Sequence, residues 1–156
     1  MPRRNRPAKR NVAPDIRYNS IPVQKFINRM MKGGKKSTSR HIMYEALDTI
    51  EARMNKPALE VFTEAMRNVM PAIEVKPRRV GGATYQIPVE VPERRQLALG
   101  IRWLLAATQG RGGRGMAAKL AAELMDAAAN TGAAVRRREE TLKMAEANRA
   151  FAHLRF

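Results

Sequence analysis

The spacing of apolar residues changes along the chain, and this change limits the possible folds more than any other feature. Over residues 20–70 apolar side chains recur at intervals of three and four, the period of an amphipathic helix. From Ile73 to Val91 the period shortens to two, as in a strand. Beyond Pro92 the helical period returns. The sequence therefore predicts a mainly α-helical domain with one two-stranded insertion.

Six helices are expected. Ser20 is a candidate N-cap for the first helix, Pro22 lies in its first turn, and Gly33–Gly34 is expected to end it. Pro71 ends the third helix, because proline cannot continue the hydrogen-bond ladder. The apolar stripes of these helices are interpreted as core. The expected helices cover approximately residues 20–32, 36–54, 57–70, 93–108, 116–129 and 133–147.

The insertion at residues 72–91 is predicted to be a protruding β-hairpin between the third and fourth helices. Apolar residues such as Ile73 alternate with polar ones such as Glu74, and Gly81–Gly82 can supply the positive φ of a tight turn. Each predicted strand contains a proline, which is typical of edge strands. Because an isolated ribbon is marginally stable in water, we expect a partner to support its tip.

The charge of the chain is strongly positive and unevenly distributed. With 30 Lys and Arg against 14 Asp and Glu, the net charge is +16; residues 1–40 carry +11 of it. Residues 1–14 are predicted to form an extended basic arm, residues 15–148 a single domain, and residues 149–156 a basic, aromatic tail. Such an excess favours a polyanionic partner, with nucleic acid preferred to a membrane.

Several classes of protein are not supported by the sequence. Without Cys there are no disulfides or thiolate metal sites, and two His residues do not form a metal-binding set. Gly110, Gly112 and Gly115 match a dinucleotide-binding pattern, but they follow a helix where that pattern needs a strand. No cofactor, metal or enzymatic activity is expected. The Arg-rich start could be a transit peptide, but its three prolines argue against one, which favours a bacterial cytoplasmic protein.

Three segments carry a resemblance to a known family. They are residues 26–36 (FINRMMKGGKK), 75–88 (VKPRRVGGATYQIP) and 144–153 (MAEANRAFAH). In this order they resemble the bacterial family of small-subunit ribosomal protein seven. The resemblance implies six helices with a β-hairpin, binding to the 3′ major domain of 16S rRNA, and nucleation of the head of the small subunit. It also implies a hairpin near the exit-site tRNA and the mRNA exit path, with ribosomal proteins nine and eleven as neighbours.

The basic side chains supply the candidate contacts with RNA, because Lys and Arg neutralise phosphates and Arg also stacks on bases. The expected rRNA-binding residues are Arg3, Arg4, Arg6, Lys9, Arg10, Lys25, Arg29, Lys32, Lys35, Lys36, Arg40, Arg94, Arg95, Arg102, Arg111, Arg114 and Lys119. The candidate residues of the hairpin, which are expected near tRNA and mRNA, are Lys76, Arg78, Arg79, Gly81, Gly82 and Tyr85. The candidate residues of the C-terminal helix are Arg136, Arg137, Arg138, Lys143 and Arg149.

Two other functions stay open at this point. A basic helical domain with a protruding ribbon could grip a DNA duplex as an architectural protein. An RNA-processing enzyme is disfavoured, because no catalytic constellation is visible. Competition between structured rRNA and duplex DNA distinguishes the first alternative, since the 2′-hydroxyl and the folded shape matter only for RNA.

Overall fold

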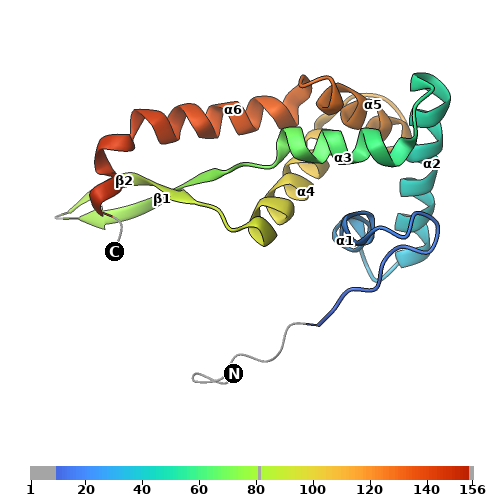
Figure 1. The fold of residues 1–156 in the computed structure, drawn as a ribbon, viewed down its shortest axis with the longest axis horizontal. Coiled ribbons are helices and arrows are strands. Elements are labelled where there is room, and N and C mark those ends of the chain that lie inside the picture. The colour runs from blue at the N-terminus through green and yellow to red at the C-terminus, as the bar shows by residue number, and fades with distance from the viewer. Residues whose placement is uncertain (1–9, 81, 155–156) are drawn as a thin grey trace.

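A computed structural model describes residues 10–80 and 82–154 (Figure 1). Five residues that the sequence predicts as contacts lie outside the described residues: Arg3, Arg4, Arg6, Lys9 and Gly81. The predicted mainly helical class with a hairpin between the third and fourth helices is confirmed. The elements are α1 (Ile21–Met30), α2 (Lys36–Met54), α3 (Ala58–Val69), β1 (Ile73–Val80), β2 (Ala83–Glu90), α4 (Glu93–Gly110), α5 (Met116–Ala128), α6 (Gly132–Ala147) and the 3₁₀ helix η1 (Arg149–Leu154).

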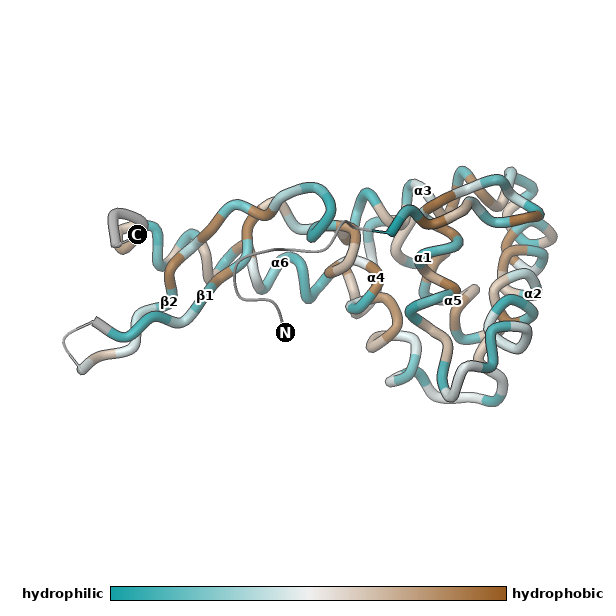
Figure 2. Tube along the Cα trace, turned by 90° about the horizontal axis from the view of Figure 1, so that it is seen from below, coloured by the Kyte–Doolittle hydropathy of each residue, from teal (hydrophilic) through white to brown (hydrophobic). Residues whose placement is uncertain are grey.

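The core is built around α5, which packs against α2, α3, α4 and α6. Its residues Leu120, Ala121 and Leu124 are fully buried. Phe26 of α1 and Phe62 of α3 meet edge to face, with ring centroids 5.9 Å apart. Hydrophobic positions therefore gather in the helical body, whereas the hairpin carries many hydrophilic ones towards its turn (Figure 2). The prediction that the apolar stripes form the core is confirmed.

The helix ends agree with the expected ranges to within about two residues, and α4 continues to Gly110, beyond the expected end at residue 108. At α1 two details differ from the prediction. Ser20 occupies the N-cap position, but its side chain makes no capping hydrogen bond, so the expected side-chain cap is wrong. The helix ends at Met30 rather than at the glycine pair. Gly33 and Gly34 have φ values of +58° and +73°, and they turn the chain into α2 instead.

The hairpin has a regular antiparallel register from Ile73 opposite Glu90 to Val80 opposite Ala83. This register leaves a two-residue turn. Gly82 in that turn has φ of +88°, which confirms the predicted positive φ at this residue. A side chain there would be strained, although the space around it is open.

The two strands do not share one apolar face, contrary to the simple alternation of the sequence. Residues directly opposite each other in an antiparallel pair point to the same face. Glu74 is opposite Val89 and Lys76 is opposite Ile87. Glu74 therefore lies on the covered face and is buried, whereas Ile73 on the other face is only half-buried. The alternation of Ile73 with Glu74 therefore does not by itself identify the covered face, because the register with β2 and the packing of α6 decide it.

The hairpin extends away from the helical body, and α6 runs along it (Figure 1). η1 then packs on β2, where the rings of Tyr85 and Phe151 lie 4.9 Å apart. The chain thus supports the length of its own ribbon. That a partner supports the tip stays a prediction.

Candidate nucleic-acid interface

A groove lies between α1 and α4, and four cationic side chains line it. Lys25 and Arg29 come from α1, and Arg94 and Arg102 come from α4. The groove has a volume of about 410 Å³. The two pairs are far apart in the sequence, so the fold brings together predicted contacts that the sequence could only name separately.

Helical spacing explains why each helix presents its cations on one side. Lys25 and Arg29 are four residues apart on α1, beside the buried residues that anchor this helix. Arg94, Ala98 and Arg102 are also spaced by four on α4, so they form one row. Packing of α1 against α4 places the two rows opposite each other.

Within residues 10–80 and 82–154, no carboxylate lies within ion-pair distance of these four cations. No carboxylate of the described part of the chain therefore neutralises their charge. Like charges that converge on a groove raise its positive potential and attract a polyanion. An RNA phosphate backbone suits such a surface, because each neutralised phosphate releases counterions and adds affinity.

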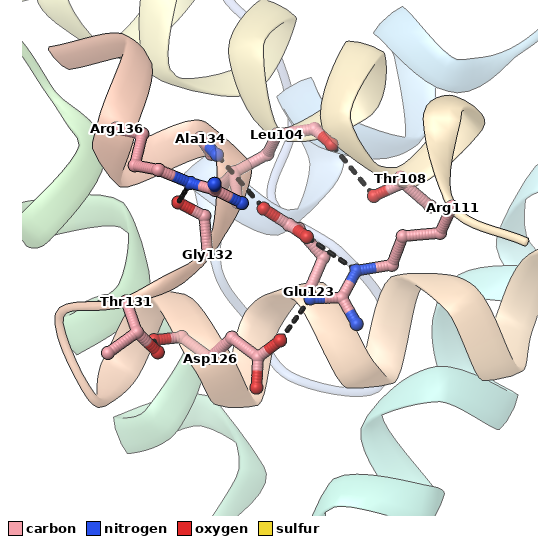
Figure 3. A network of polar contacts seen from close by, with 9 residues as sticks. All are labelled: Leu104, Thr108, Arg111, Glu123, Asp126, Thr131, Gly132, Ala134 and Arg136. Carbon is pink, nitrogen blue, oxygen red and sulfur yellow. Dashed lines mark hydrogen bonds and ion pairs between the residues drawn. The ribbon is translucent and has the colours of Figure 1, made fainter. Parts of the chain in front are cut away.

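Arg111, by contrast, is engaged inside the protein (Figure 3). Its Nε donates to Glu123 at 2.5 Å, and its Nη2 contacts Asp126. Burial lowers the pKa of Arg111, but the hydrogen bonds to Asp126 and Glu123 outweigh burial and hold that pKa above its ordinary value. The glycine and arginine loop that follows α4 is thus tied to α5 through this side chain. We do not include Arg111 in the proposed interface.

A second internal cluster lies at the base of the hairpin. Glu74 on β1 accepts a hydrogen bond from Arg95 Nε at 2.8 Å and lies 3.1 Å from Lys76 Nζ. Burial raises the pKa of Glu74, but the hydrogen bonds from Arg95 and Lys76 outweigh burial, so that pKa lies below its ordinary value. Lys76 and Arg95 thus offset a buried carboxylate, which leaves less of their charge for RNA.

The remaining predicted contacts are spread over the surface. Arg10, Lys32, Lys35, Lys36, Arg114, Arg136, Arg137, Lys143 and Arg149 are exposed, and Arg40, Lys119 and Arg138 are half-buried. On the hairpin, Arg78 and Arg79 are exposed, and Arg78 lies opposite Tyr85. In α6, Arg137 lies 3.4 Å from Glu140, a weak surface pair. These assignments stay predictions.

Five residues of the groove were not predicted from the sequence. Their side chains are apolar or neutral, so a search for cations could not find them. They are Val12, Asn28, Leu97, Ala98 and Ile101. The one available signal was the spacing of four between Arg94, Ala98 and Arg102, which marks a side of α4 distinct from its buried stripe.

The described residues contain neither a metal-binding cluster nor a membrane-spanning helix. In residues 10–80 and 82–154, no group of three His, Cys, Asp or Glu side chains could hold a metal ion. Over the same residues, no helix is both long and apolar enough to cross a membrane.

The comparisons with known proteins identify the family. The model of the family described as ribosomal protein S7p/S5e matches residues 2–149. The chain belongs to this family. A relative from Clostridium beijerinckii, the small ribosomal subunit protein uS7, is 60% identical over the full length of both chains. The uS7 protein of Chloroflexus aurantiacus is 54% identical over 98% of each chain. Membership in the S7p/S5e family confirms the resemblance seen in the sequence, and it confirms the prediction of a structural protein rather than an enzyme.

Proposed function

We propose that this chain is a structural constituent of the bacterial small ribosomal subunit, in the cytoplasm, and that it binds rRNA through the groove between α1 and α4. The observation that carries the proposal is the convergence of Lys25, Arg29, Arg94 and Arg102 without a carboxylate partner in the described part of the chain. The names of its relatives, small ribosomal subunit proteins, support this assignment.

The RNA partner that we propose is the 3′ major domain of 16S rRNA, with the protein nucleating assembly of the head. Ribosomal proteins nine and eleven are the proposed neighbours. The family resemblance supports both statements. The chain has a hydrophobic core of its own, so it needs no protein partner to present the cations of the groove. This supports binding to the rRNA early in assembly, before other proteins have bound.

A competition experiment tests RNA binding at the groove. The full chain is titrated into labelled 3′ major domain RNA at fixed salt, with unlabelled duplex DNA as competitor. Duplex DNA should displace the labelled RNA only at a large excess, because the chain should bind structured RNA more tightly than DNA. The double variant Arg29→Gln/Arg102→Gln should bind RNA about tenfold or more weakly, since each lost phosphate contact removes a charge-assisted hydrogen bond. Equal competition by DNA would support the alternative of a DNA-binding architectural protein.

The control variant removes the same charge elsewhere. Arg53 and Arg67 are exposed on α2 and α3. The variant Arg53→Gln/Arg67→Gln should bind nearly as well as the unchanged chain. If both double variants weaken binding equally, the affinity depends on net charge alone and the groove is not the interface.

For the hairpin we propose a role beside the exit-site tRNA and the mRNA exit path, rather than in anchoring the rRNA. Its turn lies far from α1 along the extended ribbon (Figure 1). Arg78 and Arg79 are exposed next to that turn, where a ligand passing the ribbon could meet them.

Shortening the hairpin tests this role. Residues 79–84 are replaced by Asn-Gly, which closes a two-residue turn on the pair Arg78 and Tyr85 and keeps the contact of Tyr85 with Phe151. Incorporation into small subunits should stay nearly normal, while the affinity for exit-site tRNA falls. If incorporation collapses and tRNA affinity in the remaining subunits is normal, the tip is an rRNA anchor instead.

A further inference from the structure

We infer that the groove between α1 and α4 holds a single unstacked nucleotide of folded RNA. Its base contacts the apolar side chains that line the groove, and its flanking phosphates contact the four cations. This inference rests on the proposed function, since it names what the RNA places in that groove. It goes beyond backbone binding, because it predicts a preference for an RNA with a nucleotide out of the helical stack.

Four apolar side chains line the groove, and we call them its floor: Val12, Leu97, Ala98 and Ile101. Ile101 is buried at 3% exposure, Leu97 and Val12 are half-buried, and Ala98 presents only a methyl group. Phosphates alone would need no apolar surface. A nucleobase does, because its flat face gains free energy by leaving water for apolar side chains. The volume of about 410 Å³ is within the range of small-molecule sites, which is about 300–1,000 Å³.

Asn28, which lines the groove from α1, also supports the binding of a base. Its Oδ1 accepts a hydrogen bond from Gln24 Nε2 at 2.9 Å, and Gln24 is itself buried at 5% exposure. This bond orients the amide. Asn28 lines the groove, and its Nδ2 group can donate to a ring nitrogen or a carbonyl on a base edge.

The four cations come in two pairs, one from each helix, and this arrangement also supports the binding of a single nucleotide. Lys25 and Arg29 line the groove from α1, and Arg94 and Arg102 line it from α4. A nucleotide that is turned out of a helix has one phosphate before it and one after it, so two pairs of cations can hold both. A regular A-form duplex keeps its bases stacked and paired, and could use the cations but not the floor.

Two RNA hairpins separate these cases. They have the same sequence, except that one carries a single bulged 2-aminopurine and the other pairs that residue. Affinity is measured by fluorescence anisotropy at fixed salt, and stacking by 2-aminopurine fluorescence. The full chain should bind the bulged RNA about tenfold more tightly, because only the bulged base can bury its face against the apolar side chains of the groove. The fluorescence of the bulge should change on binding.

Ala98→Leu is the decisive variant, because it adds bulk to the apolar lining of the groove without changing the charge. It should remove the preference for the bulge, because it lowers the affinity for the bulged RNA about tenfold more than the affinity for the paired RNA. The control is Ala106→Leu, which makes the same change at another exposed position of α4 outside this groove. It should behave as the unchanged chain does. Asn28→Ala provides a second variant from the opposite helix and should reduce the preference about threefold or more.

These measurements distinguish a failure of the proposed RNA binding from a failure of the inference about the unstacked nucleotide. If neither hairpin nor the 3′ major domain RNA binds, the proposed function fails. If both hairpins bind with equal affinity and the 2-aminopurine signal does not change, the groove binds only phosphates and this inference is overturned. If Ala98→Leu retains the full preference, the unstacked base lies elsewhere, which also overturns it.

Discussion

Glu123 joins three helices through one fully buried carboxylate. Its Oε2 accepts from Arg111, which follows α4, and its Oε1 accepts from the backbone N–H of Ala134 in the first turn of α6 at 3.0 Å (Figure 3). The preceding Gly132 has φ of +92°, and a Cβ there would approach Glu123 Oε1 to 3.2 Å. A buried charge is tolerated here because each oxygen has a donor, and it determines where α6 begins.

Replacing Glu123 by Gln should lower the free energy of unfolding by about 1–3 kcal/mol, the cost of losing a charge-assisted hydrogen bond in the interior. The amide keeps the shape and one acceptor, but Arg111 loses a counter-charge. The measurement is urea denaturation followed by circular dichroism. Glu140→Gln removes the exposed pair with Arg137 and should cost less than about 1 kcal/mol. Equal losses in the two variants would contradict the role given to burial.

Glu74 should make the stability depend on acid pH. Its folded pKa lies below the ordinary value of 4.5, so its contribution is fully present above that value and is lost as pH falls through the folded pKa. Glu74→Gln should therefore be less stable than the unchanged chain at pH 7. The difference should shrink below about pH 4.5. Denaturation midpoints at several pH values check this, and a difference that stays constant down to pH 2 would contradict it.

At the scale of elements, the hairpin depends on α6 and η1. A free two-stranded ribbon has too little buried surface to be stable alone. Here Ile87 is buried at 2% exposure, and Tyr85, which lies nearer the turn in β2, contacts Phe151 of η1. The C-terminal segment thus holds the outer half of β2 and sets the direction in which the ribbon extends.

Phe151→Ala should loosen the outer hairpin without unfolding the body. The aromatic contact is worth about 0.5–1.5 kcal/mol beyond its buried area, so local opening should become easier. Amide hydrogen exchange should accelerate at residues 84–86, while exchange in α5 stays unchanged. Arg149→Ala, at the exposed start of η1, is the matched control. Unchanged exchange in β2 of the Phe151 variant would show that η1 does not support the strand.

At the scale of the whole molecule, the positive charge is concentrated towards the N-terminus. Residues 1–40 carry +11 of the total of +16, and the first 14 residues hold five basic residues and no acidic one. Part of the basic charge further along the chain is offset by Glu74, Glu123 and Asp126. We therefore expect the N-terminal segment to supply a large share of the electrostatic affinity for RNA. The groove then supplies a defined geometry.

Deleting residues 1–12 should flatten the dependence of RNA affinity on salt. The deleted segment holds five basic residues. Each neutralised phosphate contributes about 0.7–0.9 to the slope of log K against log salt, so the slope should fall by several units. The melting temperature should change little, because the core lies in the helical body. An unchanged slope would show that the segment does not contact RNA.

The helices, the hairpin and the preference for an anionic partner could be predicted from the amino-acid sequence without coordinates. The apolar period identified α2 with its observed ends, and the glycine pair identified the turn at Gly82. These features are local, because hydrophobic period and backbone φ depend on residues close together in the chain. The three family segments, too, could be read without coordinates.

Which charges are available to a partner depends on how distant segments pack. The fold placed Arg29 and Arg102 in one groove, and it paired Arg111 of the basic loop after α4 with Glu123 of α5. It also buried Glu74 on the covered face of the ribbon. The reason is physical: an ion pair or a groove depends on how distant helix faces and strands pack, and a periodic pattern specifies a face without specifying its neighbour.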